Sequence, residues 1–416
     1  MLELGKYSMG LGDRFGRQGR AQLRALLMAR ARGVEVVPVW NKSHREHRMV
    51  HTGPQSVRRE ADEATAALGW GAAYHVDADH IGLASVEPFL EPCDFFTLDV
   101  ADFLDRGGDD VPDFVARHDA LTGSLDIPGI EEPFRIDRAR LAEIAGKVLS
   151  GVREAGRIYR RIAAARGEGR FITEISMDEV DSPQTPQELL VTLLAVAEEG
   201  IPAQTIAPRF SGRFAKGVDY AGDVARFARE LDQHLCVIRW ATRELGLPAG
   251  LKLSVHSGSD KFSIYGAIRR ALRRHDAGLH LKTAGTTWLE ELIGLAESGG
   301  DGLAIAREIH AAALGRVDEL CQPYAAVLDL DRARVPSVEV VAGWDGETFA
   351  RTLRHEPSCP RYNPHLRQLL HVAYKVAAEM GPRFLDALDR HEAVIARNVT
   401  ENIFARHVAP VFLDGA

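Results

Sequence analysis

The chain has 416 residues, with 51 Lys and Arg residues against 59 Asp and Glu residues and a net charge of −8. A mildly acidic chain lacks the excess positive charge of a general nucleic-acid binder, so we expect no nucleic-acid partner. With 45% hydrophobic and 26% charged residues, the composition is typical of a globular protein and excludes a wholly disordered one.

The N-terminus and the cysteines indicate a cytoplasmic protein. The first residues show no charged segment followed by a long apolar core, as a signal peptide would. No apolar run approaches the length of a membrane span, so we expect no membrane partner. The four cysteines, Cys93, Cys236, Cys321 and Cys359, form no C-x-x-C pair, which argues against a zinc ribbon or a redox motif.

Short apolar segments typical of β-strands alternate along the chain with longer amphipathic segments. Most are continuous apolar runs, which is typical of strands buried on both faces of a parallel sheet. The strand candidates are residues 7–12, 34–40, 74–79, 95–101, 171–177, 204–210, 251–257 and 279–284, with a ninth at 326–331.

Helical patterns separate many of these strands. Thr185 followed by Pro186 is typical of an N-cap and the first helical position, and Asp219 is the predicted cap of a later helix. The helical candidates are residues 19–31, 137–165, 186–199, 219–245, 262–275 and 287–297.

Repeated strand-then-helix units predict an α/β fold with a parallel sheet. Polar residues recur at the C-terminal ends of many strands, which favours a TIM-like (β/α)8 barrel over an open doubly wound sheet. Residues 102–133 are rich in Gly, Asp and Pro and predict an inserted loop over one barrel mouth. Residues 332–416, with helical stretches at 364–380 and 382–397, predict a mainly helical extension. We expect a single domain with its barrel core at residues 5–331, and the extension offers a surface for a homo-oligomer.

Three histidines lie at or near the ends of predicted strands: His80, His256 and His280. Barrel enzymes usually build their sites from the ends of several strands. Histidines mixed with carboxylates suit a divalent cation such as Zn²⁺ or Mn²⁺. We therefore predict these three histidines as metal ligands, although most of the 16 histidines in the chain will be surface or packing residues.

Two carboxylates accompany the histidines. Asp79 lies where a strand turns into a loop, and Glu174 lies inside an otherwise apolar strand. A charge inside a barrel strand is costly unless it is paired or coordinated. We predict Asp79 and Glu174 as catalytic acid and base, with two alternatives left open: either could complete the metal shell, and Glu174 could be the structural partner of Lys252 or Lys282.

Other polar residues suit the binding of an anion. Ser257 and Thr283 begin strand-to-helix turns, where free backbone N–H groups favour a carboxylate or phosphate, although such residues also cap helices. Lys261, Lys282 and Arg209 could reach an acidic substrate. The glycines near residues 10–16 do not follow the G-x-G-x-x-G spacing, and the sequence has no Walker A motif and no G-x-S-x-G elbow, so we predict neither nucleotide binding nor a serine nucleophile.

Seven segments in chain order carry a family resemblance. They are GDRFGRQGRAQLRA from Gly12, PVWNKSHREH from Pro38, VDADHI from Val76, KLSVHSGSDKFSIY from Lys252, HLKTAGTTWLEE from His280, RYNPHLRQLLHVAYK from Arg361 and VTENIFARH from Val399. The chain resembles the tagaturonate epimerase family, which interconverts tagaturonate and fructuronate in bacterial hexuronate catabolism. The resemblance implies an isomerase that depends on a divalent cation, with Zn, Mn, Co and Ni not distinguished, and a small sugar acid as substrate.

The chemistry of such an epimerase suits the residues found at the strand ends. The two sugar acids differ at a carbinol carbon β to the ketone, whose C–H the ketone does not acidify. We therefore expect retro-aldol cleavage through a metal-held enediolate, rotation of the aldehyde and re-addition, rather than oxidation by NAD, for which the sequence shows no fingerprint. Lys282, Lys261 or Arg209 would hold the substrate carboxylate. The alternatives are an epimerase of neutral ketoses, an aldolase or isomerase of sugar acids, and a metabolite-binding barrel without catalysis.

Overall fold

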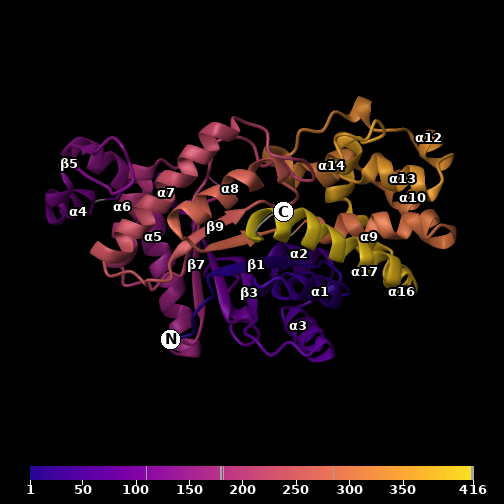
Figure 1. Cartoon of the computed structure of the whole chain (residues 1–416), viewed down its shortest axis with the longest axis horizontal. Helices are drawn as coiled ribbons and strands as arrows, with labels where there is room; N and C mark the ends of the chain where they lie inside the picture. The colour runs from indigo at the N-terminus through magenta and orange to yellow at the C-terminus, as the bar shows by residue number, and fades with distance from the viewer. Residues whose placement is uncertain (109, 179, 181, 284, 414–416) are drawn as a thin grey trace.

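Eight parallel strands close into a barrel at the centre of the computed structural model, which describes residues 1–413 except 109, 179, 181 and 284 (Figure 1). The order around the barrel is β1-β10-β9-β8-β7-β4-β3-β2, and every neighbouring pair is parallel. The predicted TIM-like fold is confirmed. The barrel strands are β1 (Tyr7–Gly12), β2 (Val37–Ser43), β3 (His75–Ile81), β4 (Phe95–Asp99), β7 (Ile172–Ser176), β8 (Thr205–Ala207), β9 (Lys252–His256) and β10 (Leu279–Lys282).

The inside of the barrel is apolar at one end and polar at the other. Successive side chains of a strand point alternately into the barrel and out to the helices. At the N-terminal end of the strands a separate buried cluster forms a floor from Leu4, Val37, Val39, Phe95 and Ile172. Further along the same strands the inward positions are polar, so the ionisable groups gather at the carboxyl end.

Helices cover the outside of the barrel (Figure 1). Thr185 and Glu188 form the capping box that starts α6, as the Thr185-Pro186 pair predicts, and Asp137 caps α5. The helices up to residue 321 are α1 (Gly19–Arg30), α2 (His44–Met49), α3 (Gln55–Leu68), α4 (Val111–Arg117), α5 (Arg138–Arg166), α6 (Pro186–Glu198), α7 (Val224–Glu244), α8 (Phe262–His275), α9 (Thr286–Glu297), α10 (Gly300–Gly315) and α11 (Val317–Cys321).

Three expectations about local structure need correction. The ninth strand at 326–331 is absent from the described residues, because β1 pairs with β10 and a closed barrel has no edge left to extend. Asp219 does not cap α7, which Asp223 caps; its carboxylate instead accepts from the backbone N–H of Ser263 at the start of α8. The second strand begins at Val37, three residues later than expected, and the last residue of the predicted strand 279–284 lies outside the described residues.

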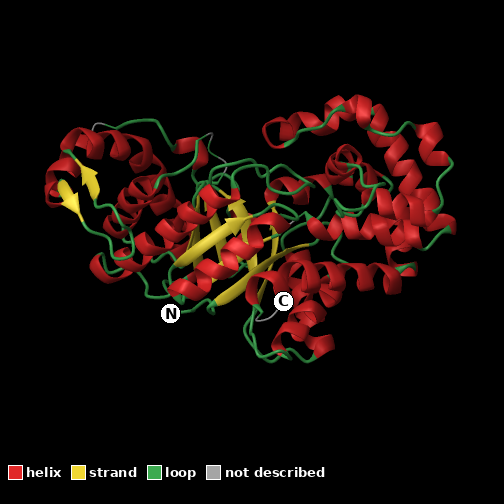
Figure 2. Ribbon diagram, turned by 45° about the horizontal axis from the view of Figure 1, so that its top comes forward, coloured by secondary structure: helices red, strands yellow, loops and turns green. Residues whose placement is uncertain are grey.

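The insertion at 102–133 packs against the outer helices instead of covering a barrel mouth. It contains α4, and its strand β5 (Gly123–Leu125) pairs with β6 (Phe134–Ile136) in a small antiparallel sheet. His118 contacts Glu198 at the end of α6, and Arg239 of α7 donates to the carbonyl of Pro128. Figure 2 shows the small sheet well apart from the barrel strands.

The C-terminal extension is helical, as predicted, and packs beside the barrel. Contacts join α17 to α9 and to α1, and α13 to α9. Within the described residues, no helix has the length and apolar character needed to cross a membrane. The helices of the extension are α12 (Val338–Ala342), α13 (Gly346–Leu353), α14 (Pro364–Val372), α15 (Tyr374–Glu379), α16 (Pro382–Arg390), α17 (Glu392–Glu401), the π-helical segment η6 (Asn402–Val408) and α18 (Ala409–Phe412).

Candidate active site

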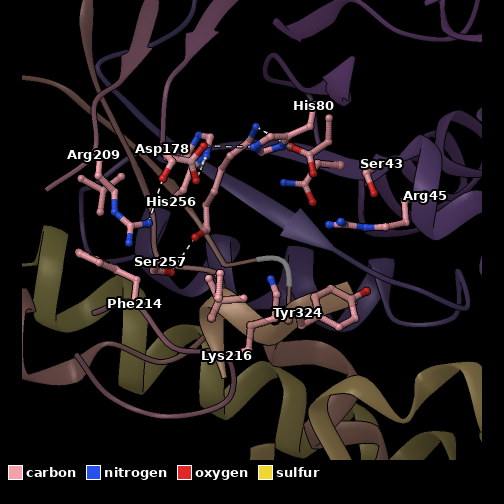
Figure 3. A pocket seen from close by; sticks show the side chains of 18 of the residues that line it. Ser43, Arg45, His80, Asp178, Arg209, Phe214, Lys216, His256, Ser257 and Tyr324 are labelled. Carbon is pink, nitrogen blue, oxygen red and sulfur yellow. Dashed lines mark hydrogen bonds and ion pairs between the residues drawn. The ribbon is translucent and has the colours of Figure 1, made fainter. Parts of the chain in front are cut away.

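A cavity of about 400 Å³ opens at the carboxyl ends of the barrel strands (Figure 3). This is the end at which barrel enzymes place their catalytic residues. Its lining comes from many strand ends and from the segment at 323–327 that follows α11. Its polar lining includes Arg14, Asn41, Glu46, Asp79, His80, Asp178, Arg209, His256, Ser257 and Lys282.

Two histidines and one aspartate meet at one side of the cavity. One ligand atom each from His80, Asp178 and His256 lies within 4.8 Å of the others. His80 Nε2 is 3.2 Å from Asp178 Oδ1, and His256 Nδ1 is 3.1 Å from Asp178 Oδ2. Figure 3 shows the three side chains converging from separate strand ends.

A second carboxylate holds each histidine from behind. His80 Nδ1 lies 2.9 Å from Asp79 Oδ1, and His256 Nε2 lies 2.8 Å from Glu174 Oε1. Burial disfavours the charged form of His256, but Asp178 and Glu174 outweigh it and raise its pKa to about 9. The site therefore attracts positive charge strongly.

The residues present fit a divalent cation. Two imidazoles and a carboxylate are a ligand set that Zn²⁺, Mn²⁺ and related ions accept, and a carboxylate behind each histidine is the usual arrangement around metal-binding imidazoles. His256 Nδ1 is buried, and within the described part of the chain no group completes a hydrogen bond with it. This nitrogen lies 3.1 Å from Asp178 Oδ2, so it is the atom of His256 that would meet a cation beside Asp178.

Lys282 lies beside this group inside a cage of carboxylates. Its ammonium is 2.8 Å from Asp77, 2.8 Å from Asp79 and 3.1 Å from Glu174, and it donates to the hydroxyl of Thr97 at 2.6 Å. Burial raises the pKa of Asp77 to about 7, against the lowering effect of Lys282. The open alternative that Glu174 pairs with Lys282 agrees with this geometry, whereas Lys252 donates to the carbonyl of Leu4.

The structure brings together His80, His256, Asp79 and Glu174 of the predicted set but keeps His280 apart. His280 points into the barrel one layer deeper, where its Nδ1 lies 2.8 Å from the hydroxyl of Ser8 and its ring packs against Phe95. Burial lowers the pKa of His280 to about 3, so this imidazole is neutral. It is not one of the three residues whose ligand atoms converge.

The predicted anion-binding residues are divided between the cavity and the interior. Arg209 and Ser257 line the cavity, with Arg209 donating to the carbonyl of Asp178 and Ser257 to that of Lys282. Lys261 is buried behind the wall and donates to Ser259 and to the carbonyl of Asp260. The hydroxyl of Thr283 donates to the carbonyl of Gly10. Lys261 and Thr283 therefore stabilise the loops around the cavity through these hydrogen bonds.

Sequence reasoning missed Asp77 and Asp178, and both carried a detectable signal. Asp77 precedes Asp79 by two residues, so both side chains point to the same side of β3. Asp178 follows β7 within two residues, at the same end as His80 and His256. A search for every acidic residue within two positions of a predicted strand end would have found Asp178.

His80 adopts a backbone conformation that few residues tolerate. Its φ is 52°, in the left-handed region, although it is not a glycine. Such strain costs of the order of 1–3 kcal/mol and persists where the surrounding structure compensates for it. Here Asp79 and Asp178 hold the ring on both sides, so the strained backbone places the imidazole into the cavity.

Known proteins resemble this chain over almost its whole length. A family profile described as tagaturonate epimerase matches residues 1–409. A tagaturonate/fructuronate epimerase from Thermotoga maritima is 27% identical over 96% of this chain and 80% of its own length. The native crystal structure of the fructuronate-tagaturonate epimerase UxaE from Cohnella laeviribosi matches with a TM-score of 0.80 and 25% identity, over 99% of this chain and 82% of that one. A second structure of that enzyme, complexed with one glycerol, has a TM-score of 0.81 and 24% identity over 99% and 82% of the two chains.

Proposed function

Because the chain belongs to the tagaturonate epimerase family and is a carbohydrate epimerase of the isomerase class, we propose that it interconverts D-tagaturonate and D-fructuronate with the help of a divalent cation. The observation that carries this proposal is the convergence of His80, Asp178 and His256 at the carboxyl end of the barrel. Each histidine is oriented by a further carboxylate, which is what a metal-binding imidazole requires.

We assign the cation to these three residues. His280 remains deeper in the barrel and holds Ser8 in this proposal. When bound, a divalent cation supplies Lewis-acid polarisation of the ketone oxygen. The protein's own groups then have to move one proton and retain the cleaved substrate.

Proton transfer falls to Asp79 in this proposal. Asp79 lines the cavity, whereas Glu174 is fully buried beneath it. Burial alone would raise the pKa of Asp79, but Lys282 and His80 outweigh it and hold the pKa below its ordinary value. The contacts of this carboxylate with His80 and Lys282 both use Oδ1, so Oδ2 is the atom that would accept the hydroxyl proton. Glu174 then acts as the residue that orients His256 and shares the charge of Lys282.

The bond changes follow from the position of the epimerised carbon. Removal of the carbinol hydroxyl proton lets the oxygen form an aldehyde while the adjacent C–C bond breaks. The bonding electron pair passes to the ketone side and gives an enediolate. Rotation of the aldehyde by half a turn and re-addition of the enediolate place the hydroxyl on the other face, and Asp79 returns the proton. Atoms and charge balance without an external oxidant.

The cavity has to keep two fragments together between cleavage and re-addition. Its volume of about 400 Å³ lies within the range of sites that enclose small ligands. Arg209 and Ser257 are fixed on its wall by their hydrogen bonds to backbone carbonyls, which keeps the wall rigid while the aldehyde turns. An aldolase would release the fragments, so retention separates the two reactions.

Turnover of D-tagaturonate by the purified chain tests the proposal. A sample treated with chelator is compared with samples supplied with Mn²⁺, Zn²⁺, Co²⁺ or Ni²⁺, and the products are separated by chromatography. We expect fructuronate as the product, loss of activity after chelation and recovery with at least one metal. Unchanged activity in the metal-free sample would contradict the metal role, and three-carbon products would indicate an aldolase.

A further inference from the structure

Arg14 is a buried cation that faces the cavity with most of its hydrogen-bonding capacity unused. It is 6% exposed and follows β1 by two residues. Its Nη2 lies 3.2 Å from Glu46, and its guanidinium stacks on the ring of Tyr374 at 4.2 Å. The other two nitrogens, Nε and Nη1, are buried and find no hydrogen-bond partner among the described residues. A buried guanidinium with unused donors suits an anionic ligand.

The loop that carries Arg14 is rigid. The carboxylate of Asp13 accepts hydrogen bonds from the backbone N–H groups of the four residues that follow Arg14, at 2.5 to 3.0 Å. Lys42 donates to the carbonyl of Arg14 itself at 3.1 Å. The guanidinium is therefore held in place before any ligand arrives, and a ligand does not have to order it.

Asn41 lines the same cavity as Arg14 and lies near Lys282. Asn41 pairs with Gly12 in the register of β1 and β2, and its side chain is buried, with 2% of the residue exposed. In the described structure neither its amide nitrogen nor its amide oxygen has a partner. A Cβ on Gly10 would lie 2.8 Å from the Asn41 amide nitrogen and 2.7 Å from Lys282, so only glycine lets the two side chains lie together there.

The barrel places Arg14 opposite Asp178, while β3 and β9, which carry His80 and His256, are each two strands from β1. Strand β1 is four strands from β7 in either direction around the eight-stranded barrel, and Asp178 follows β7. A tagaturonate molecule carries its ketone near one end and its carboxylate at the other. With the ketone beside Asp178, His80 and His256, the carboxylate extends towards the β1 side.

We propose that Arg14 binds the carboxylate of the substrate and makes the enzyme select sugar acids over neutral ketoses. This inference rests on the proposed function and explains how the enzyme would distinguish a sugar acid from a neutral ketose. Lys282 cannot take that part, since three carboxylates already surround its ammonium. Arg209 lies beside Asp178, at the ketone end, and Lys261 lies behind the cavity wall.

The test compares D-tagaturonate with D-tagatose, in which a CH2OH group replaces the carboxylate. We expect Arg14→Met to lower kcat/KM for tagaturonate by about 100-fold or more, because it removes one partner of a buried charge pair. Turnover of tagatose should stay within about threefold of the wild type, which also shows that the variant is folded. The kcat/KM of Arg14→Lys for tagaturonate should lie between those of the wild type and Arg14→Met. Lysine keeps the positive charge but lacks the planar guanidinium group.

Arg209→Met is the matched control in the same cavity. Arg209 supports the backbone of Asp178, so its loss should lower the turnover of both substrates by the same factor. An equal loss for both substrates in Arg14→Met, or in Arg14→Lys where the Met variant does not fold, would overturn the inference. A wild type that converts tagatose as efficiently as tagaturonate would overturn it too, while the epimerase proposal would stand.

Failure of the proposed function can be told apart from failure of this inference. If the wild type converts neither sugar, the epimerase proposal fails, and binding of tagaturonate is measured by calorimetry. Weaker binding of tagaturonate to Arg14→Lys than to the wild type would then still support the carboxylate site. Equal binding to both would overturn it.

Discussion

His80 and His256 reach one point through different ring nitrogens. Asp79 holds Nδ1 of His80, so Nε2 faces Asp178, whereas Glu174 holds Nε2 of His256, so Nδ1 faces Asp178. The carboxylate behind each ring fixes its tautomer and its orientation. The arrangement of the two imidazoles at this point therefore depends on three carboxylates, those of Asp79, Glu174 and Asp178.

Replacement of single histidines tests the metal assignment. His256→Asn should lose the bound metal and lower turnover by at least about 100-fold, because one ligand atom is removed. His280→Asn should keep the metal, since His280 contacts Ser8 a layer deeper. Metal content of dialysed protein, measured by mass spectrometry, gives the comparison. A His280 variant without metal beside a His256 variant with metal would reverse the assignment.

The limits of the sequence are clear at the same scale. Alternation along a strand indicates that Lys282 and His280 point to the same side, but not that they occupy different layers of the barrel. Depth depends on the stagger of neighbouring strands, which pairs His280 with Ser8 and Lys282 with Gly10. Arg14 was also out of reach, because its importance lies in donors left unused by Glu46 and Tyr374, and those contacts come from distant elements.

At the scale of elements, prediction succeeded where one segment decides its own conformation. The strand at residues 7–12 and the helix at 262–275 have the bounds that their apolar patterns and flanking residues predict. Prediction from the sequence failed where contacts with another element determine the conformation of a segment. Residues 326–331 have the composition of a strand but meet a barrel that is already closed, and Asp219 serves α8 rather than α7.

Helix α9 is joined to the C-terminal π-helical segment by a buried carboxyl group. Asn402 donates to Glu290 Oε1 at 2.9 Å, and burial raises the pKa of Glu290 to about 7. Between about pH 4.5 and 7 the native state holds this proton and the unfolded state does not. The free energy of unfolding therefore falls as pH rises through that range, because native Glu290 resists ionisation.

Glu290→Gln should remove this loss. Relative to the wild type, the variant should gain about 2.5 kcal/mol in unfolding free energy between pH 5 and pH 8, at about 1.4 kcal/mol per pKa unit. Denaturant unfolding at both pH values measures it. Glu392→Gln, at an exposed site on α17, is the control. An equal change in both variants would show that burial of Glu290 does not set the pH dependence.

At the scale of the molecule, one buried carboxylate joins the barrel to the extension. Asp260, in the loop after β9, lies 2.8 Å from Arg367, 3.2 Å from His355 and 3.1 Å from His407. Arg367 also donates to the carbonyls of Gly217 and Leu353. These three partners all come from the extension, while the hydroxyl of Thr286 in α9 also donates to the carboxylate, so Asp260 ties the loop beside Ser257 to the extension.

This connection predicts that barrel and extension unfold as one unit. Arg367→Met should lower the unfolding free energy by about 3–5 kcal/mol, because it leaves a buried charge without its main partner, and it should keep a single transition. Arg390→Met removes an exposed ion pair with Asp301 and should cost less than about 1 kcal/mol. Calorimetry distinguishes the cases, and two separate transitions would contradict a single domain.

The position of these partners has a consequence for synthesis on the ribosome. A chain emerges from its N-terminus, and the barrel strands are complete once Lys282 has left the exit tunnel. The partners of Asp260 emerge later, first His355, then Arg367 and then His407. Until these residues have emerged, the loop beside the cavity lacks the partners of its buried carboxylate, so the nascent protein can complete its barrel before it completes the surroundings of its site.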